Sequence, residues 1–209
     1  MAPQQAPGTV TATAADEDAA LLTALARRAG AGDPVATRHF LSAVWPKVGR
    51  VVVGVLGSRH PDIDDVVQQT LIAVTQALPA FRGDCHPAGY ASRIALHVAL
   101  RARRHTAARR ARSETLRQYS LSEPEEAPHE ELGSERRKRA MRDLLSELPE
   151  EQADALGLRV LLGWSLEEVA TAGGVPINTV RSRVRLAKEA LRKRLEERPE
   201  LAGELEFRP

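Results

Sequence analysis

The sequence predicts an all-α protein made of two small helical domains. Ala, Leu and Val carry the 43% hydrophobic content, whereas aromatic residues make up only 3%. Apolar residues recur at steps of three and four, and strand-type alternation is hard to find. An acidic, proline-containing stretch separates two such regions. We therefore expect a disordered leader (1–15), a helical domain (16–112), a flexible acidic linker (113–134), a second helical domain (135–198) and a frayed tail (199–209).

The first two helices are expected from their end signals. Acidic residues 16–18 precede a short apolar pattern that stops at Gly30. Asp33 followed by Pro34 is a strong start for the second helix, because aspartate caps a helix and proline fits its first turn. Pro46 lies inside the second pattern, where it removes a backbone hydrogen bond, so we expect it to bend or divide the helix.

The third expected helix opens with three aspartates, Asp62, Asp64 and Asp65. The helix dipole favours negative charge at this end, and this structural explanation is sufficient for one or two of them. Three in four positions, followed by Gln68 and Gln69 on an exposed face, also fit a polar docking surface. Both interpretations stay open at this point.

A fourth helix is expected from Ala88 to about Arg112, with Tyr90, Ile94 and Val98 facing inward. Its other faces are rich in arginine. Such a density of positive charge suits a nucleic-acid backbone. The arginines concerned are Arg93, Arg101, Arg103, Arg104, Arg109, Arg110 and Arg112.

The second domain contains the pattern of a helix-turn-helix. Ser165 and Glu168 have the spacing of a capping box, which starts a helix. Gly173 and Gly174 then stop it, because paired glycines accept the left-handed backbone of a tight turn. Pro176 restarts the chain in a longer helix with an apolar stripe.

The long final helix is strongly basic on its other faces. Between residues 181 and 198 there are eight Lys or Arg against three Glu, a local net charge of +5. A basic helix facing solvent is the ordinary alternative for such a run. The combination with the capping box and the glycine turn favours DNA binding instead. Its leading end carries the side chains that can read base edges: Asn178, Thr179, Arg181, Ser182 and Arg185.

Other function classes find little support in the sequence. The only cysteine, Cys85, excludes an internal disulfide, and with His86 it forms just two adjacent potential ligands, so we expect no metal and no cofactor. Six scattered histidines and the lack of a glycine-rich phosphate loop argue against an enzyme. No apolar run approaches the roughly 20 residues of a membrane span, so we expect a cytoplasmic protein without membrane insertion.

Two stretches resemble the sigma-70 family, specifically the small two-domain extracytoplasmic-function (ECF) group. Residues 61–84 are similar to its region 2, with an Asp-x-Asp-Asp start and a Phe-Arg-Gly-Asp loop. Residues 148–195 are similar to region 4, including the Thr-Val-Arg-Ser-Arg core of its recognition helix. The resemblance covers most of residues 16–197. It implies a transcription initiation factor that binds core RNA polymerase and promoter DNA, held by an anti-sigma factor.

The resemblance also implies three groups of site residues. The surface that docks on core polymerase would comprise Asp62, Asp64, Asp65, Gln68 and Gln69. The non-template strand of the minus-10 element would be taken by Arg82, Asp84, His86, Tyr90, Arg93, His97 and Arg101. The minus-35 element would be read in the major groove by Asn178, Thr179, Arg181, Ser182 and Arg185.

The chain departs from the family along the minus-10 helix. Family members usually carry Trp, Asn and Asp there, where this chain has Tyr90, His97 and Leu100. Tyrosine can still stack on a base, but leucine is apolar. Either the minus-10 preference is unusual or this part of the helix serves another contact. The rival class is a helix-turn-helix regulator that acts without docking on polymerase, with the N-terminal helices as a dimerisation or sensing module.

Overall fold

The computed structural model describes residues 14–117 and 133–198. Every regular element in these two ranges is helical, which confirms the predicted all-α class. The elements are α1 (Ala14–Gly30), α2 (Pro34–Leu56), α3 (Ile63–Ala77), the 3-10 helix η1 (Leu78–Ala80), α4 (Pro87–Arg117), α5 (Gly133–Glu147), α6 (Glu150–Leu161), α7 (Leu166–Gly173) and α8 (Ile177–Glu197).

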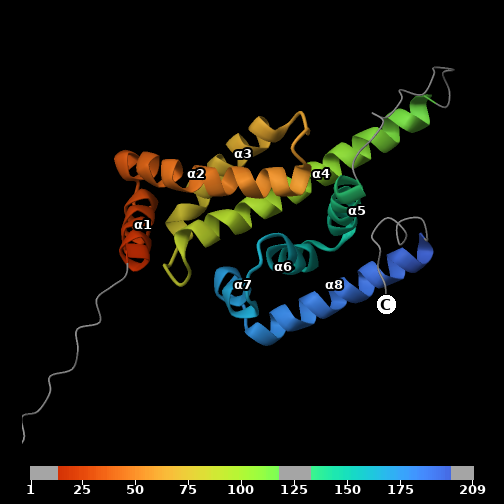
Figure 1. The fold of residues 1–209 in the computed structure, drawn as a ribbon. Helices are drawn as coiled ribbons and strands as arrows, with labels where there is room; N and C mark the ends of the chain where they lie inside the picture. The colour runs from red at the N-terminus through yellow and green to blue at the C-terminus, as the bar shows by residue number, and fades with distance from the viewer. Residues whose placement is uncertain (1–13, 118–132, 199–209) are drawn as a thin grey trace, which may run out of the picture.

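The helices form two groups that share one hydrophobic core (Figure 1). In the N-terminal group, α1 to α4, the long helix α4 packs along α2 and α3. In the C-terminal group, α5 to α8, helix α6 lies between α4 on one side and α8 on the other. The two groups are therefore in direct contact along α4.

Helix α2 is the central helix of the N-terminal group. Asp33 caps it as predicted, since its carboxylate accepts from the backbone N–H groups of Val35 at 2.9 Å and Ala36 at 3.0 Å. Pro46 does not divide it, contrary to one of the two outcomes expected. Pro46 and Ser42, whose carbonyl loses its partner, are both exposed, so water can solvate that carbonyl.

By length and composition alone, α2 could also cross a membrane, with a mean hydropathy of 1.2 over 18 residues. This corrects the expectation that no apolar run approaches that length. Phe40, Val44, Val48 and Val52 of this helix are fully buried among the other helices. Its apolar character is that of a core helix.

Helix α4 differs from its prediction in length and in orientation. It runs five residues beyond Arg112, so the first residues assigned to the linker are helical. Tyr90, Ile94 and Val98 are only partly buried, whereas Ala91, Ala95 and Ala99 are completely buried. Small alanines let α4 approach its neighbours closely, and the bulkier residues lie at the edge of that contact.

The predicted leader and linker are only partly within the described residues. Residues 14 and 15 belong to α1, and residues 133 and 134 belong to α5. The rest of the leader, residues 118–132 of the linker and the tail from 199 onward lie outside the described ranges. The division into domains at the predicted boundaries stays a prediction.

Candidate nucleic-acid and polymerase interfaces

The helix-turn-helix forms where the sequence predicts it. The Ser165 hydroxyl accepts from the Glu168 N–H at 3.0 Å, and the Glu168 carboxylate accepts from the Ser165 N–H at 2.7 Å. This reciprocal capping box begins α7. Gly174 ends the helix with a positive φ of 62°, the left-handed conformation that favours glycine. The turn ends α7 at Gly173 and lets α8 begin at Ile177.

The candidate minus-35 residues lie together at the start of α8. Thr179 is half-buried and the other four are exposed. Arg181 donates to the side-chain oxygen of Asn178 at 3.0 Å, and Arg185 pairs with Glu189 at 2.7 Å. These contacts stay within the helix and face solvent, so the hydrogen-bonding groups at the leading end remain accessible to a ligand.

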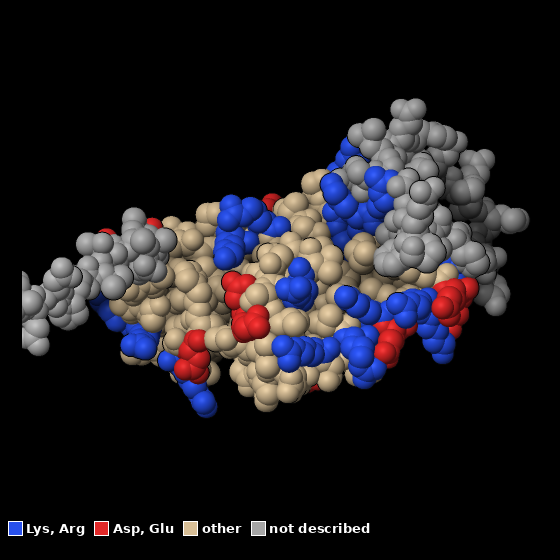
Figure 2. Space-filling view, turned by 60° about the horizontal axis from the view of Figure 1, so that its bottom comes forward, with Lys and Arg blue, Asp and Glu red and all other residues tan. Residues whose placement is uncertain are grey.

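The opposite face of α8 anchors it to the rest of the C-terminal group. Val180 and Ala187 are buried, and Arg183 pairs with Glu151 of α6 at 2.7 Å. Arg194 pairs with Glu147 of α5. Figure 2 turns α8 toward the viewer and shows Lys and Arg side chains following it, with acidic ones among them. The helix is therefore held by one face and presents a basic surface on the others.

The candidate docking residues also share one surface. Asp64, Asp65, Gln68 and Gln69 are exposed along α3. Asp62 precedes the helix as its N-cap residue but makes no side-chain capping hydrogen bond. Ile72, one turn further along, is 51% exposed and adds an apolar group to the same face. Ile72 is not among the predicted docking residues, although its spacing of seven from Asp65 and four from Gln68 places it on the same face.

The candidate minus-10 residues differ in exposure. Four are exposed: Arg82, Asp84, His86 and Arg101. The other three, Tyr90, Arg93 and His97, are partly buried. The His86 ring nitrogen Nδ1 accepts from the Ala88 N–H at 3.2 Å, which helps to cap α4. Partial burial, together with Lys47, lowers the pKa of His86. His86 is therefore a neutral cap residue near neutral pH rather than a cation.

Tyr90 is held by the N-terminal group itself. Its hydroxyl donates to the Ala77 carbonyl at 3.2 Å. Its ring packs on Phe81 with 5.1 Å between centroids and a tilt of 51°. Partial burial raises the pKa of Tyr90. The half-buried ring is therefore held in place at the start of α4 by Phe81 and by the hydrogen bond of its hydroxyl.

Arg93 and His97 face the C-terminal group instead of solvent. Arg93 donates to the Ala172 carbonyl of α7 at 3.2 Å. His97 Nδ1 lies 3.3 Å from Glu150 Oε1 and 3.7 Å from Asp154 Oδ2, both on α6. Burial raises the pKa of Asp154, and His97 partly offsets that effect. The two candidate minus-10 residues are therefore already partnered within the chain.

Two neighbouring arginines on α4 were predicted only as part of a nucleic-acid face. Arg103 donates to the carbonyls of Val55 and Leu56 at the end of α2, both at 3.3 Å. Arg104 donates to the Ser146 and Leu148 carbonyls at 2.6 and 3.1 Å. Both instead satisfy carbonyl groups at helix ends. The periodicity of α4 could not reveal this, since the partners are more than 40 residues away.

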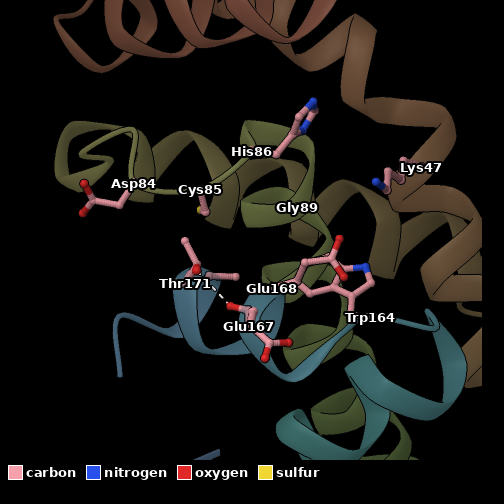
Figure 3. A pocket seen from close by; sticks show the side chains of 10 residues that line it. Lys47, Asp84, Cys85, His86, Gly89, Trp164, Glu167, Glu168 and Thr171 are labelled. Atoms are coloured by element: carbon pink, nitrogen blue, oxygen red, sulfur yellow. Dashed lines mark hydrogen bonds between the residues drawn. The ribbon is translucent and has the colours of Figure 1, made fainter. Parts of the chain in front are cut away.

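A cleft of about 500 Å³ lies where the loop before α4 meets α7 (Figure 3). Asp84, Cys85 and His86 line one side, and Trp164 and Glu168 line the other. Burial raises the pKa of the Cys85 thiol, so the thiol is protonated at neutral pH. Among the described residues, no three His, Cys, Asp or Glu side chains are grouped to hold a metal ion.

Comparison with known families gives two matches. The family described as "Sigma-70 region 2" matches residues 40–110, from within α2 to within α4. The description "Sigma-70, region 4" matches residues 138–191, which span most of α5 to α8. One match falls within each helical group, with α1 outside the first match, and the two follow the order that the sequence predicts.

Similar proteins match most of the chain. The ECF RNA polymerase sigma factor SigC of Mycobacterium tuberculosis is 32% identical over 188 residues, covering 87% of this chain and 94% of that protein. SigD of the same species is 36% identical over 168 residues, 77% of each chain. A solved structure, CnrH in complex with the cytosolic domain of CnrY, is 20% identical with a TM-score of 0.48, covering 85% of this chain and 99% of that one. The chain belongs to the extracytoplasmic-function sigma factors of the sigma-70 family.

Proposed function

We propose that this protein is a transcription initiation factor that binds core RNA polymerase and directs it to promoters with two spaced elements. The observation that supports this most strongly is the pairing of two separate exposed surfaces in one chain. The start of α8 presents base-reading side chains, and α3 presents a carboxylate-rich face. A regulator that only binds DNA has no use for the second surface.

The start of α8 is proposed to enter the major groove of the minus-35 element. Arg181, Ser182 and Arg185 would reach base edges there, with Asn178 and Thr179 beside them. Exposed cations further along α8, such as Lys188 and Arg192, would hold phosphates and release counterions. The anchored face of α8 keeps this arrangement rigid.

The exposed face of α3 is proposed to dock on the polymerase. Asp62, Asp64 and Asp65 would provide the charge, and Gln68 and Gln69 would provide hydrogen bonds. Ile72 at the same face would add buried apolar area, as central interface residues commonly do.

The loop before α4 and the start of α4 are proposed to take the non-template strand of the minus-10 element. Exposed Arg82 and Arg101 would contact phosphates, and the ring of Tyr90 would stack on a base. Asp84 and His86 complete the exposed part of this surface. Arg93 and His97 would join it only after leaving their present partners.

The same proposal extends to the activity, location, partner and linker of the protein. The protein would act without enzymatic activity of its own, in the cytoplasm, and would bind an anti-sigma factor. The acidic segment would link a region 2 domain to a region 4 domain. Holding both promoter elements at once would multiply two weak affinities, and the length of the linker would set their spacing.

The experiment that tests this function combines the purified chain with core RNA polymerase on a pool of genomic promoter fragments. New transcript starts that need both components, and share two spaced upstream motifs, are the expected result. DNA binding without any core-dependent start would support the rival regulator instead.

A further inference from the structure

A carboxylate stands on the candidate base-reading face of α8. Four side chains share one side of this helix, because they follow one another at steps of four, three and four: Asn178, Ser182, Arg185 and Glu189. The Glu189 side chain is 51% exposed, and acidic side chains are visible among the basic ones along α8 (Figure 2). A negative charge on a face that meets DNA repels phosphates and lowers affinity. Glu189 therefore has a cost for DNA binding that another role must offset.

Glu189 holds one of the arginines on this face. Arg185 Nη1 donates to Glu189 Oε1 at 2.7 Å, the length of a charge-assisted hydrogen bond. The other arginine at the leading end, Arg181, donates to the neutral side-chain oxygen of Asn178 at 3.0 Å. Each arginine is thus directed by a partner within α8, but only Arg185 has a charged partner.

The pair of Arg185 and Glu189 contributes little to the stability of the fold. The two side chains are 64% and 51% exposed, and water screens an ion pair of this kind. The arginine precedes the glutamate in the chain, which is the less favourable order for a pair four residues apart. The pair of Arg183 and Glu151 differs, because it joins α8 to α6. Within residues 14–117 and 133–198, Glu189 forms no ion pair with another helix.

The carboxylate favours a base contact of Arg185 over a phosphate contact. A guanidinium has several N–H donors, so the bond to Glu189 leaves others free for a guanine edge, whose O6 and N7 acceptors carry no net charge. A phosphate in the same position would lie near the Glu189 carboxylate, and like charges repel at such a distance. Exposed Lys188 and Arg192 can hold phosphates instead, since neither has an ion pair among the described residues.

We propose that Glu189 is a positioning residue that reserves Arg185 for a base edge, so that sequence discrimination rises while overall affinity for DNA falls. This inference rests on the proposed reading of the minus-35 element by α8. It gives a role in specificity to a residue that does not itself contact a base. Arg181, whose partner Asn178 is neutral, provides a comparison at another base pair within the same helix.

A small set of variants separates the charge of Glu189 from its other properties. Glu189→Gln keeps the size of the side chain and an oxygen acceptor but removes the charge. Arg185→Ala removes the arginine, alone and together with Glu189→Gln. The matched control is Glu196→Gln, which makes the same charge change seven residues further along the same face. Glu196 is exposed and has no ion pair in the described part of the chain, so its loss releases no arginine.

The assay measures binding of the full-length chain with core RNA polymerase to a duplex pool in which about ten consecutive base pairs, one turn of DNA, are randomised. Sequencing of the bound and free duplexes gives the preference at each position. The bound fraction at several salt concentrations, after subtraction of binding by core alone, gives the mean affinity and its salt slope. Arg185→Ala and Arg181→Ala identify the position that each arginine reads.

We expect Glu189→Gln to lower the preference at the Arg185 position by about fivefold or more and to raise the mean affinity for the pool. The salt slope should steepen by about 0.9, because Arg185 gains a phosphate contact. The preference at the Arg181 position should not change, and Glu196→Gln should leave every preference unchanged. In the Arg185→Ala background, Glu189→Gln should have no effect on preference, because the side chain that it positions is absent.

An unchanged or stronger preference at the Arg185 position in Glu189→Gln would overturn the proposal. A loss that persists in the Arg185→Ala background, or one shared by all positions, would also overturn it, since Glu189 would then not act through Arg185. The same holds if Arg185→Ala changes the preference at no position. A wild-type chain without preference at any position would instead count against the proposed reading of the minus-35 element itself.

Discussion

The guanidinium Nη2 of Arg103 on α4 lies 2.7 Å from the carboxylate Oδ1 of Asp143 on α5. The same guanidinium donates to two carbonyls at the C-terminal end of α2. Those carbonyls have no partner within α2, and positive charge is favoured at that helix end. Burial lowers the pKa of Arg103, and the charge of Asp143 opposes that effect. Arg103 therefore joins three helices from the two groups through one side chain.

Replacing Arg103 with methionine should destabilise the protein. Methionine keeps much of the side-chain volume but leaves the α2 carbonyls and Asp143 without their donor. We expect a loss of about 1 to 3 kcal/mol in the free energy of unfolding, measured by urea denaturation. Arg109→Met on the exposed part of the same helix is the control and should change stability by less than about 0.5 kcal/mol. Equal effects of the two changes would show that Arg103 is not a structural link.

Ser165→Ala tests the capping box at the start of the helix-turn-helix. The change removes the acceptor for the Glu168 N–H, which then has no partner within α7. The expected loss is about 1 kcal/mol in the free energy of unfolding, with a range of about 0.5 to 2. Ser42→Ala, an exposed residue in the middle of α2, should not destabilise, because alanine is the better helix former. A destabilisation by Ser42→Ala as large as that by Ser165→Ala would argue against the cap.

Local signals made much of this fold predictable. The caps at Asp33 and Ser165 and the turn at Gly174 each depend on residues within four positions, and the structure confirms all three. The candidate surfaces on α3 and at the start of α8 are exposed as the sequence pattern indicates. These features need no knowledge of distant partners.

The parts that depend on distant contacts were not predictable from the pattern. The inward face of α4 was placed on its bulky residues Ile94 and Val98, but small alanines make the closest packing. Arg103 and Arg104 hydrogen-bond to carbonyl groups more than 40 residues away in the chain, which a local pattern does not reveal. Periodicity describes one helix at a time, and α4 has partners on more than one side.

The Asp33 cap predicts a pH dependence of stability. The Ala36 N–H and the Arg28 guanidinium, in that order, hold the pKa of Asp33 below its usual range. A carboxylate with a lowered pKa stabilises the fold above the pKa of the unfolded chain, about 4, and loses that contribution as the pH falls through the folded value. Asp33→Asn keeps an acceptor but does not titrate. The difference in unfolding free energy between wild type and variant should be constant above about pH 5 and shrink below about pH 4. The same difference in unfolding free energy at about pH 3 and at about pH 7 would contradict a stabilising contribution of the ionised Asp33 carboxylate.

Asp65→Lys tests the proposed docking surface on α3. The residue is exposed, so the change should leave the fold intact, but it reverses one charge at the centre of the proposed interface. We expect affinity for core polymerase to fall about tenfold, measured by fluorescence anisotropy with purified core. Asp18→Lys on α1 makes the same charge change away from α3 and should have little effect. Unchanged affinity for Asp65→Lys would remove this face of α3 from the interface.

Arg181→Ala tests the proposed role of α8 in reading the minus-35 element. Arg181 is exposed and donates to the side-chain oxygen of Asn178, its neighbour on the same helix, so the guanidinium can turn toward a base without breaking the fold. If it contacts a base edge, binding to the matching duplex should weaken by about 1 to 3 kcal/mol and specificity at that base pair should relax. Arg192→Ala, exposed further along α8, should weaken binding to all sequences alike and lower the salt dependence. The measurement is a competition gel shift at fixed salt with duplexes substituted one base pair at a time. A loss below about 0.5 kcal/mol for Arg181→Ala, with no change in sequence preference, would leave this residue as a phosphate contact at most.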